Sequence, residues 1–221
     1  MSAALLPLLR AAAAAAAPVA IANTANGEST TNSSSYSFSG VSIGAAAADR
    51  IVVFCFAGDA GSGRTISSVT INGSAATLIQ QNASGNIRCG MYALAVPAGT
   101  TATLAVTFSG SMNRCMYSAF AITGADGAAA HASGNDVTST YGVSINVPAD
   151  GGAIAFAAGR EAASYSFTGV TEDVDAVSSE GGTSRAAAHD EFASAQTPLA
   201  IGMTPSAGGD HVLLAASWGP P

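Results

Sequence analysis

The sequence predicts an all-β protein: an antiparallel, jelly-roll-like β-sandwich made of two similar sets of strands, preceded by a short N-terminal α-helix. Three observations carry this prediction. Apolar and hydroxyl-bearing residues alternate over 101–109, short apolar runs are separated by glycine- and proline-rich turns, and motifs of the first half recur in the same order in the second. Alternation with a period of two is typical of a strand that buries one face.

The alanine-rich segment at 1–22 is expected to be an anchoring helix. Alanine is the best helix former, Pro7 is tolerated in a first turn and Pro18 ends a helix, so the helical residues are expected at 7–17. Arg10 interrupts the apolar run and no basic region precedes it, which argues against a secretory signal. A helix folded back on its own domain is the alternative to an anchor. The residues expected to make the anchoring contacts are Leu5, Leu6, Leu8, Leu9, Ala13 and Ala17.

Residues 23–35 are small and polar, which predicts a linker between the helix and a β-sandwich domain at 36–221. The first strand of that domain is expected at 36–43. The second, at 50–57, is a continuous apolar run, as in a strand with both faces buried. AsnGly at Asn72 then favours a tight type I′ hairpin, because both residues accept positive φ.

The stretch 89–125 is expected to be a three-stranded meander. Its strands are predicted at 91–96, 101–109 and 115–122, and ProAlaGly at Pro97 makes the first turn. The middle strand has one apolar face and one face of hydroxyls. An apolar sheet face needs a covering layer, so the meander predicts a second sheet.

The three cysteines, Cys55, Cys89 and Cys115, are an odd number, which does not indicate a disulfide framework. Cys89 and Cys115 begin the outer strands of the expected meander, two strand spacings or about 9.6 Å apart. A disulfide requires Cα atoms within about 7 Å. We therefore expect free thiols, with Cys55 as a small buried apolar residue.

The second half of the chain resembles the first, which divides the domain into 36–125 and 137–221. ValSerIle precedes an apolar run in both halves, and this match sets Phe54 against Phe156 at an offset of 102 residues. Further pairs in the same order are Ser67 with Thr168, Arg88 with Arg185, Leu104 with Ile201 and Arg114 with His211. The two sets of strands form either one sandwich or two small sandwiches in tandem.

The charge of the chain is strongly acidic. Seven arginines, no lysine and fourteen acidic residues give a formal charge of −7, which disfavours nucleic acid or an anionic membrane as a partner. Eleven of the acidic residues lie at Asp126 or later, so the negative charge belongs to the second half. A solvated acidic surface is the expectation, and binding of a cation there stays open.

No catalytic residue and no cofactor site is predicted. His189 adjoins Asp190, and Asp210 and His211 lie near Ser217, so Ser/His/Asp combinations exist. No GlyXaaSerXaaGly elbow lies between a strand and a helix pattern, however. These residues therefore predict no hydrolase site.

No metal site is predicted either. GluAspValAsp at 172–175 would place Asp173 and Asp175 on one strand face, but the spacing of a calcium loop is absent and a solvated acidic turn is favoured. The glycine-rich loop at 58–64 lacks the lysine of a phosphate-binding loop. Trp218, the single tryptophan, is expected to close the core rather than to bind a sugar.

The strand and turn pattern resembles that of small β-sandwich proteins encoded by tailed bacteriophages, prophages and gene transfer agents of GC-rich bacteria. The segments that carry the resemblance are 65–79, 91–111, 117–125 and 214–220, within 41–221. The resemblance implies a virion component mounted outside the particle, as a head decoration, a spike, a fibre or a minor tail protein. Some such proteins bind host surface polysaccharide. The resemblance implies no catalytic residue.

We therefore expect a non-enzymatic virion structural protein that is assembled in the host cytoplasm. Its expected partners are other virion proteins, copies of itself and host surface polysaccharide, and not nucleic acid or a membrane. Two alternatives stay open. One is a secreted or cell-surface carbohydrate-binding or adhesion module, processed near Ala22 or Ala25; the other is a hydrolase that depends on His189 or His211.

Overall fold

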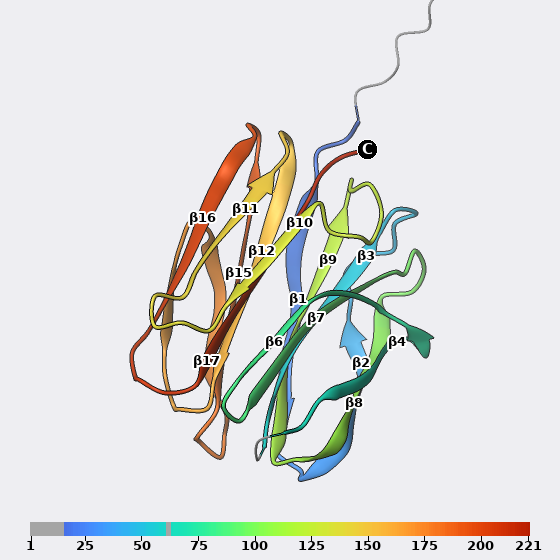
Figure 1. The fold of residues 1–221 in the computed structure, drawn as a ribbon. Coiled ribbons are helices and arrows are strands. Elements are labelled where there is room, and N and C mark those ends of the chain that lie inside the picture. The colour runs from blue at the N-terminus through green and yellow to red at the C-terminus, as the bar shows by residue number, and fades with distance from the viewer. Residues whose placement is uncertain (1–15, 61–62) are drawn as a thin grey trace, which may run out of the picture.

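The computed structural model describes residues 16–60 and 63–221, which form layered β-sheets (Figure 1). Seventeen strands occur in these residues, all of the pairings between them are antiparallel, and no helix is present in them. The predicted all-β class is confirmed.

Most of the expected N-terminal helix lies outside the described residues. This applies to Leu5, Leu6, Leu8, Leu9 and Ala13. Ala17 is described, and it is exposed and not helical. The last part of the expected anchor, 20–22, belongs to the first strand, where Ile21 pairs with Ile122. Of the helical residues expected at 7–17, only 16 and 17 are described, and neither is helical, so the helix is not supported there; residues 20–22 of the expected anchor pair with the buried strand β9 instead.

The first half of the chain forms two sheets. A five-stranded sheet has the order β1-β9-β3-β7-β6, and a four-stranded sheet has the order β2-β8-β4-β5. The strands are β1 (Ala20–Ser29), β2 (Ser33–Ser42), β3 (Ile51–Asp59), β4 (Ile66–Ile71), β5 (Ser74–Ala75), β6 (Thr77–Ser84), β7 (Ile87–Ala95), β8 (Thr101–Met112) and β9 (Arg114–Thr123).

The second half repeats this topology. Its five-stranded sheet has the order β10-β17-β12-β15-β14 and its three-stranded sheet the order β11-β16-β13. Every strand of the first half therefore has a counterpart in the second, except the two-residue β5. The strands are β10 (Ala132–Asp136), β11 (Gly142–Val147), β12 (Gly151–Gly159), β13 (Tyr165–Thr168), β14 (Thr171–Val177), β15 (Ser184–Phe192), β16 (Gln196–Pro205) and β17 (His211–Trp218).

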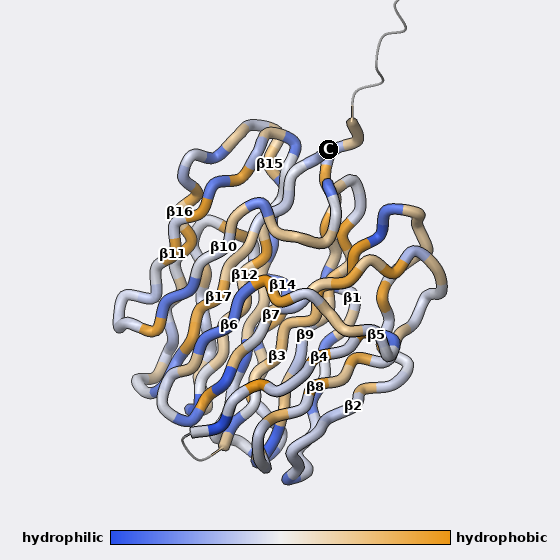
Figure 2. Tube along the Cα trace, turned by 45° about the vertical axis from the view of Figure 1, so that its right-hand side comes forward, coloured by the Kyte–Doolittle hydropathy of each residue, from blue (hydrophilic) through white to orange (hydrophobic). Residues whose placement is uncertain are grey.

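The four sheets stack as layers with three hydrophobic cores between them (Figures 1 and 2). Each half is a sandwich with its own core, which we call the first-half core and the second-half core. The two five-stranded sheets face each other across a third core, which we call the central core. Its larger members include Val53, Met91, Phe120, Ile122, Ile154, Phe156, Leu214 and Trp218. The two sandwiches are thus packed back to back.

The strands β3 and β12 occupy the middle of the five-stranded sheets and are buried along their whole length. Each has a core on both faces: Val53 lies in the central core, for example, and Phe54 in the first-half core. The prediction that 50–57 is a strand buried on both sides is confirmed. In β12 seven of the nine residues are alanine or glycine, so this central strand is built from small residues.

The expected meander is wrong. The strands β7 and β9 do lie in one sheet, but β3 stands between them, and β8 belongs to the opposite sheet. Burial explains the difference: β7 and β9 are covered on both faces, whereas β8 alternates between buried and exposed residues and covers the first-half core. The alternation at 101–109 marks an outer strand, and the continuous apolar runs on either side of it mark inner strands.

The segment 23–35, expected to be a linker, forms most of β1 and the start of β2. Edge strands pair through backbone groups and so tolerate a polar composition. The small residues here also have a packing role, because a Cβ on Gly27 would meet the ring of Tyr117 at 2.6 Å. This prediction is therefore wrong: the segment is a structural part of the first sandwich.

The register of the repeat differs by one residue from the predicted offset. Phe54 lies in the first-half core, but Phe156 lies in the central core, so the two side chains point to different layers. In a β-strand, a shift of one residue reverses the face of every side chain. The matching residues are instead Gly58 and Gly159, 101 residues apart (159 minus 58), because the Cβ position of each is filled by side chains of its own sandwich.

Candidate functional site

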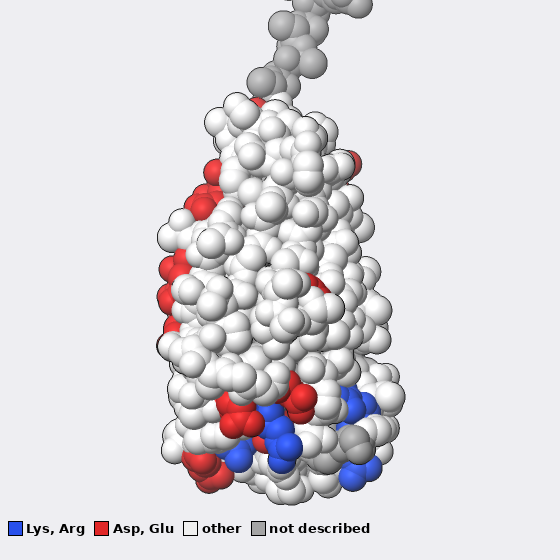
Figure 3. Space-filling model, turned by 60° about the vertical axis from the view of Figure 1, so that its left-hand side comes forward, with Lys and Arg blue, Asp and Glu red and all other residues white. Residues whose placement is uncertain are grey.

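Arginines and several acidic side chains gather at one end of the molecule, and further acidic side chains line one side of it (Figure 3). Figure 3 shows arginines and acidic residues together at the end opposite the one that carries the C-terminus in Figure 1. Both β3 and β12 end here. Asp59, the last residue of β3, forms an ion pair with Arg160, the residue just after β12. We call this the distal end.

A cleft of about 400 Å³ opens at the distal end between the two sandwiches. In the first half it lies at the end of β3 and the start of β9. In the second half it lies just after β12 and just before β15. Its lining residues are Asp59, Asn113, Arg114, Arg160, Glu161 and Gly182. We call it the distal cleft.

Asp59 forms the base of the distal cleft and is only 3% exposed. Its Oδ2 lies 3.8 Å from Arg114 Nε and accepts a hydrogen bond from Thr183 Oγ1 at 3.2 Å, and its Oδ1 lies 3.6 Å from Arg160 Nε. Within the described residues, Oδ1 and Arg114 Nε have no hydrogen-bond partner. Both atoms are buried, and each faces an opposite charge, at 3.6 Å for Oδ1 and 3.8 Å for Arg114 Nε, so they belong to an ion-paired cluster between the two sandwiches.

Arg114 also joins the two sandwiches. It donates to the carbonyl of Gly181 and to Ser178 Oγ, at 3.5 Å, both in the turn between β14 and β15. Arg114 belongs to β9 and its acceptors belong to the second half, so the walls of the cleft are held by bonds across the sandwich boundary.

A second set of polar contacts lies beside the cleft. Arg185 Nε donates to Ser118 Oγ at 3.3 Å, and the backbone N–H of Ser179 donates to Glu28 Oε1 at 3.1 Å. Burial alone would raise the pKa of Glu28, but hydrogen bonds from Ser179 and Ser178 outweigh it and lower that pKa. Burial lowers the pKa of Arg185, and nearby Glu28 opposes this. These contacts make the boundary polar near the distal end.

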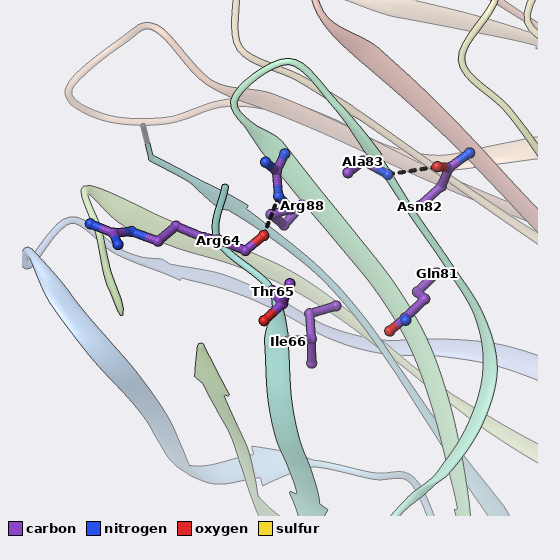
Figure 4. Close-up of a pocket in the computed structure, with 7 residues that line it drawn as sticks. All are labelled: Arg64, Thr65, Ile66, Gln81, Asn82, Ala83 and Arg88. Carbon is purple, nitrogen blue, oxygen red and sulfur yellow. Dashed lines mark hydrogen bonds between the residues drawn. The ribbon is translucent and has the colours of Figure 1, made fainter. Parts of the chain in front are cut away.

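A second pocket, of about 290 Å³, lies between β4, β6 and β7 (Figure 4). Arg88 lines it, but its guanidinium donates to the carbonyls of Arg64, Gly85 and Ile87 at 2.6 to 2.8 Å. The side chain of Arg64 points away from the pocket in Figure 4 and covers Gly110. This pocket therefore offers few free charged donors.

The structure does not bring Asp210, His211 and Ser217 together as a catalytic group. His211 is buried; its Nε2 donates to the carbonyl of Ala207 at 2.9 Å, which leaves Nδ1 to accept from Tyr165 Oη at 3.2 Å. Ser217 Oγ donates to a backbone carbonyl of β11. Both ring nitrogens of His211 thus have structural partners.

His189 pairs with a carboxylate at the edge of the central core. Its Nδ1 lies 2.7 Å from Asp173 Oδ2, and its ring packs edge-on against Phe120. The neighbouring Asp190 accepts instead from Thr171 Oγ1, and Glu191 accepts from the backbone N–H of Ile21. The hydrogen bond with Asp173 raises the pKa of His189.

This pair makes stability depend on pH. Because the pKa of His189 is raised on folding, its contribution is full below about pH 6.5, the ordinary histidine pKa, and is lost as the pH rises through the folded value. We expect Asp173→Asn to lower the free energy of unfolding more at about pH 5.5 than at about pH 8. Urea denaturation of both proteins at the two pH values measures this. The exposed Asp126→Asn serves as the control, and an equal loss at both pH values for Asp173→Asn would contradict the assignment.

The acidic segment 172–175, expected to be a solvated turn, lies in strand β14. A bulge in β14 between Glu172 and Val174 separates the two aspartates: Asp173 pairs with His189, and Asp175 accepts from the backbone N–H of Tyr165. No group of three histidine, cysteine or acidic side chains that could hold a metal ion occurs at 16–60 or 63–221. The three cysteines are free, as predicted. All three are buried, which was predicted only for Cys55, and burial raises the pKa of each thiol.

Sequence reasoning missed the distal cleft. Asp59 and Arg160 follow the matching glycines Gly58 and Gly159, so they occupy equivalent positions in the two repeats with opposite charges. The sequence signal is therefore GlyAsp and GlyArg at the ends of two matching apolar runs. It is recognisable only with the repeat in its correct register.

Comparison of the chain with models of protein families, with curated proteins and with solved structures gave no match. No helix capable of crossing a membrane was found in the part of the chain that the structure describes. The geometry of the two sandwiches and of the distal end therefore carries the functional argument.

Proposed function

We propose that this protein is a non-enzymatic structural component of a bacteriophage-like virion, attached through its N-terminal segment and displaying its two sandwiches on the particle exterior. The observation that carries the proposal is that the two ends of the molecule differ. Residues 16–19 precede β1 at the end where the C-terminus lies, and the charged cleft lies at the other end (Figures 1 and 3). Attachment at the first end leaves the distal end free for contacts outside the particle.

Two further features support display. The alternate residues of the outer strands are small and hydroxylated, such as Thr103 and Thr107 on β8 and Ser37 on β2, which suits faces exposed to solvent. The second is the resemblance in strand pattern to phage-encoded sandwich proteins, which is the basis for placing the protein on a virion.

The test is the oligomeric state of the full chain. We expect the wild type to form oligomers in sedimentation velocity, and Leu8→Glu with Leu9→Glu to abolish them, because charged side chains cannot be buried in an apolar contact without a partner. Ser37→Glu, on an exposed strand face, is the matched control and should leave the oligomer intact. A wild type that stays monomeric and is missing from purified particles would contradict the proposal.

A carbohydrate-binding or adhesion module is the second candidate, and the polar distal cleft favours it. Its secreted form would be processed near Ala22 or Ala25. Both residues lie in β1 and pair with β9, so cleavage there would remove part of an edge strand that contributes Ile21 to the central core. Intact mass of the protein from cells distinguishes the two candidates.

A further inference from the structure

We propose that the outer edge of β6, together with the pocket of about 290 Å³ beside it, binds an extended acidic peptide segment of a partner protein by strand addition. We call the edge and the pocket the strand-addition site. This inference goes beyond the proposed function and does not depend on attachment to a particle. Strand addition requires backbone groups along an open edge, space for alternate side chains of the incoming strand, and a rigid template.

The outer side of β6 offers backbone groups for pairing. Within the described residues, β6 is the last strand of its sheet and pairs only with β7. In an antiparallel strand, alternate residues direct both of their backbone groups to the same side. The N–H groups of Gln81 and Ala83 face outward, because each donates to the side-chain oxygen of the preceding residue, at 3.0 and 2.7 Å, the second of which Figure 4 shows. An incoming strand can replace these amide oxygens with its own carbonyl groups, so no donor is lost.

The composition of β6 does not protect its edge. Edge strands commonly carry charges or proline, which prevent pairing with other chains. The counterpart of β6 in the second half, β14, has Glu172, Asp173 and Asp175 among its seven residues, whereas the eight residues of β6 include no charged residue and no proline. Each strand has one β-bulge, so a bulge does not distinguish them. The edge of β14 is therefore guarded by charge and that of β6 is open.

The pocket provides space beside this edge. The strand β4 packs against β7, and β5 beyond it has only two residues, so the four-stranded sheet does not cover β6 along its length. Leu78 illustrates this: it stands opposite Tyr92, a member of the first-half core, yet it is 47% exposed. The uncovered space is lined by Ile66 and Gln81, among others (Figure 4). Alternate side chains of an added strand would point into it.

The charge of the pocket favours an acidic peptide. Its lining includes Arg64 and Arg88 and no acidic residue. The bonds of Arg88 to backbone carbonyls use Nε and Nη1, and within the described residues Nη2 has no acceptor. A carboxylate that reaches Nη2 forms a charge-assisted hydrogen bond, which is stronger than one between neutral groups. Ile66 lies in the same pocket, so a glutamate, with an apolar stem before its carboxylate, matches the lining.

The template is held in place by the second sandwich. In the turn after β6, the backbone N–H of Asn86 donates to Asp210 Oδ2 at 3.3 Å. Farther along the strand, the side-chain amide of Asn82 donates to Asn135 of β10. A strand that is fixed before binding loses little conformational entropy on binding, which favours affinity.

Binding of synthetic peptides to the full chain tests the proposal. The acidic probe is the acetylated and amidated octapeptide Thr-Val-Thr-Glu-Thr-Val-Thr-Glu. Lysine replaces both glutamates in one control peptide, and proline replaces the fifth residue in another. We expect the acidic peptide to shift the backbone amide NMR signals of Gln81 and Ala83 and, at saturation, to slow their hydrogen exchange at least about tenfold, because both N–H groups then bond within a sheet. Each control peptide should bind at least about tenfold more weakly.

Two variants at one position separate charge from bulk. Ala83→Glu places a carboxylate on the edge, opposite Arg88 in the ladder, and should weaken binding of the acidic peptide at least about tenfold. Ala83→Lys adds similar bulk and should bind that peptide at least as tightly as the wild type. Val177→Glu, at an exposed position of β14, is the distant control and should leave binding unchanged. Urea unfolding curves establish that each variant is folded.

Several outcomes would overturn the proposal: exchange at Gln81 and Ala83 that the acidic peptide does not slow, equal binding of either control peptide, or undiminished binding by folded Ala83→Glu. Protection of these two amides that rises with protein concentration in the absence of peptide would also overturn it, by assigning the edge to a second copy of the chain. The assay does not require assembly. Its failure therefore leaves the virion proposal intact, and a wild type that stays monomeric leaves the strand-addition site intact.

Discussion

Phe156→Ala is expected to lower the free energy of unfolding by about 3 to 5 kcal/mol, the usual cost of truncating a buried aromatic side chain. Phe156 is 0% exposed, and it points from the middle of β12 into the central core. Its neighbours across the sheet include Ala187 and Leu214. Small side chains cannot move to fill the space, so a cavity remains.

Urea denaturation followed by Trp218 fluorescence measures this effect. Trp218 is the only tryptophan and lies in the same core, so its emission reports on the contact between the two sandwiches. Phe167→Ala, a half-buried phenylalanine of β13, is the control and should cost clearly less. A loss below about 1 kcal/mol for Phe156→Ala would show that the two five-stranded sheets do not enclose this residue.

Arg50→Met is expected to destabilise the protein by about 3 kcal/mol, because it removes four hydrogen bonds from a buried guanidinium, one of them to the carbonyl of the buried Val96. Arg50 is 1% exposed, and its guanidinium donates to the carbonyls of Gly44, Ala45, Val96 and Ala98 at 2.7 to 2.8 Å. It thereby ties the loop before β3 to the turn after β7. Methionine keeps the apolar stem but supplies no donor.

Two variants make this test specific. Arg50→Lys keeps the charge, but its single ammonium cannot span four carbonyls, so it should recover only part of the loss. Arg64→Met removes an exposed arginine and should change the free energy of unfolding by less than about 0.5 kcal/mol. Equal stability of Arg50→Met and the wild type would mean that the four bonds do not hold the two loops.

Local features of the chain were predictable because short-range forces determine them. The AsnGly turn is formed as expected: Asn72 and Gly73 have φ values of 55° and 80°, and Ile71 pairs with Ser74 in the hairpin. The continuous apolar run at 50–57 is a strand buried on both faces. Trp218 lies in the central core, as its position at the end of an apolar run indicated.

The candidate site was not predictable to the same degree. Asp59 lies in a glycine-rich segment whose composition indicates only a loop, and Arg114 begins a strand whose partners were not known. They meet because β9 pairs with β3, and Arg160 joins them from the second sandwich. The sequence marks Asp59 and Arg160 only as GlyAsp and GlyArg at the ends of two apolar runs, and that signal requires the repeat in its correct register.

Local sequence patterns were sufficient to predict the inner strand at 51–59, the AsnGly turn, the free thiols and the repetition of the two halves, but not β1 (Ala20–Ser29), since alternation, turn residues and composition act over a few residues. Only the tertiary structure decided which sheet each strand joins, which face each residue presents and which charges meet at the distal end. The physical reason is that sheet pairing uses backbone groups common to all residues, so partners are chosen by the burial of whole layers. A shift of one residue, as between Phe54 and Phe156, then changes the core that a side chain fills.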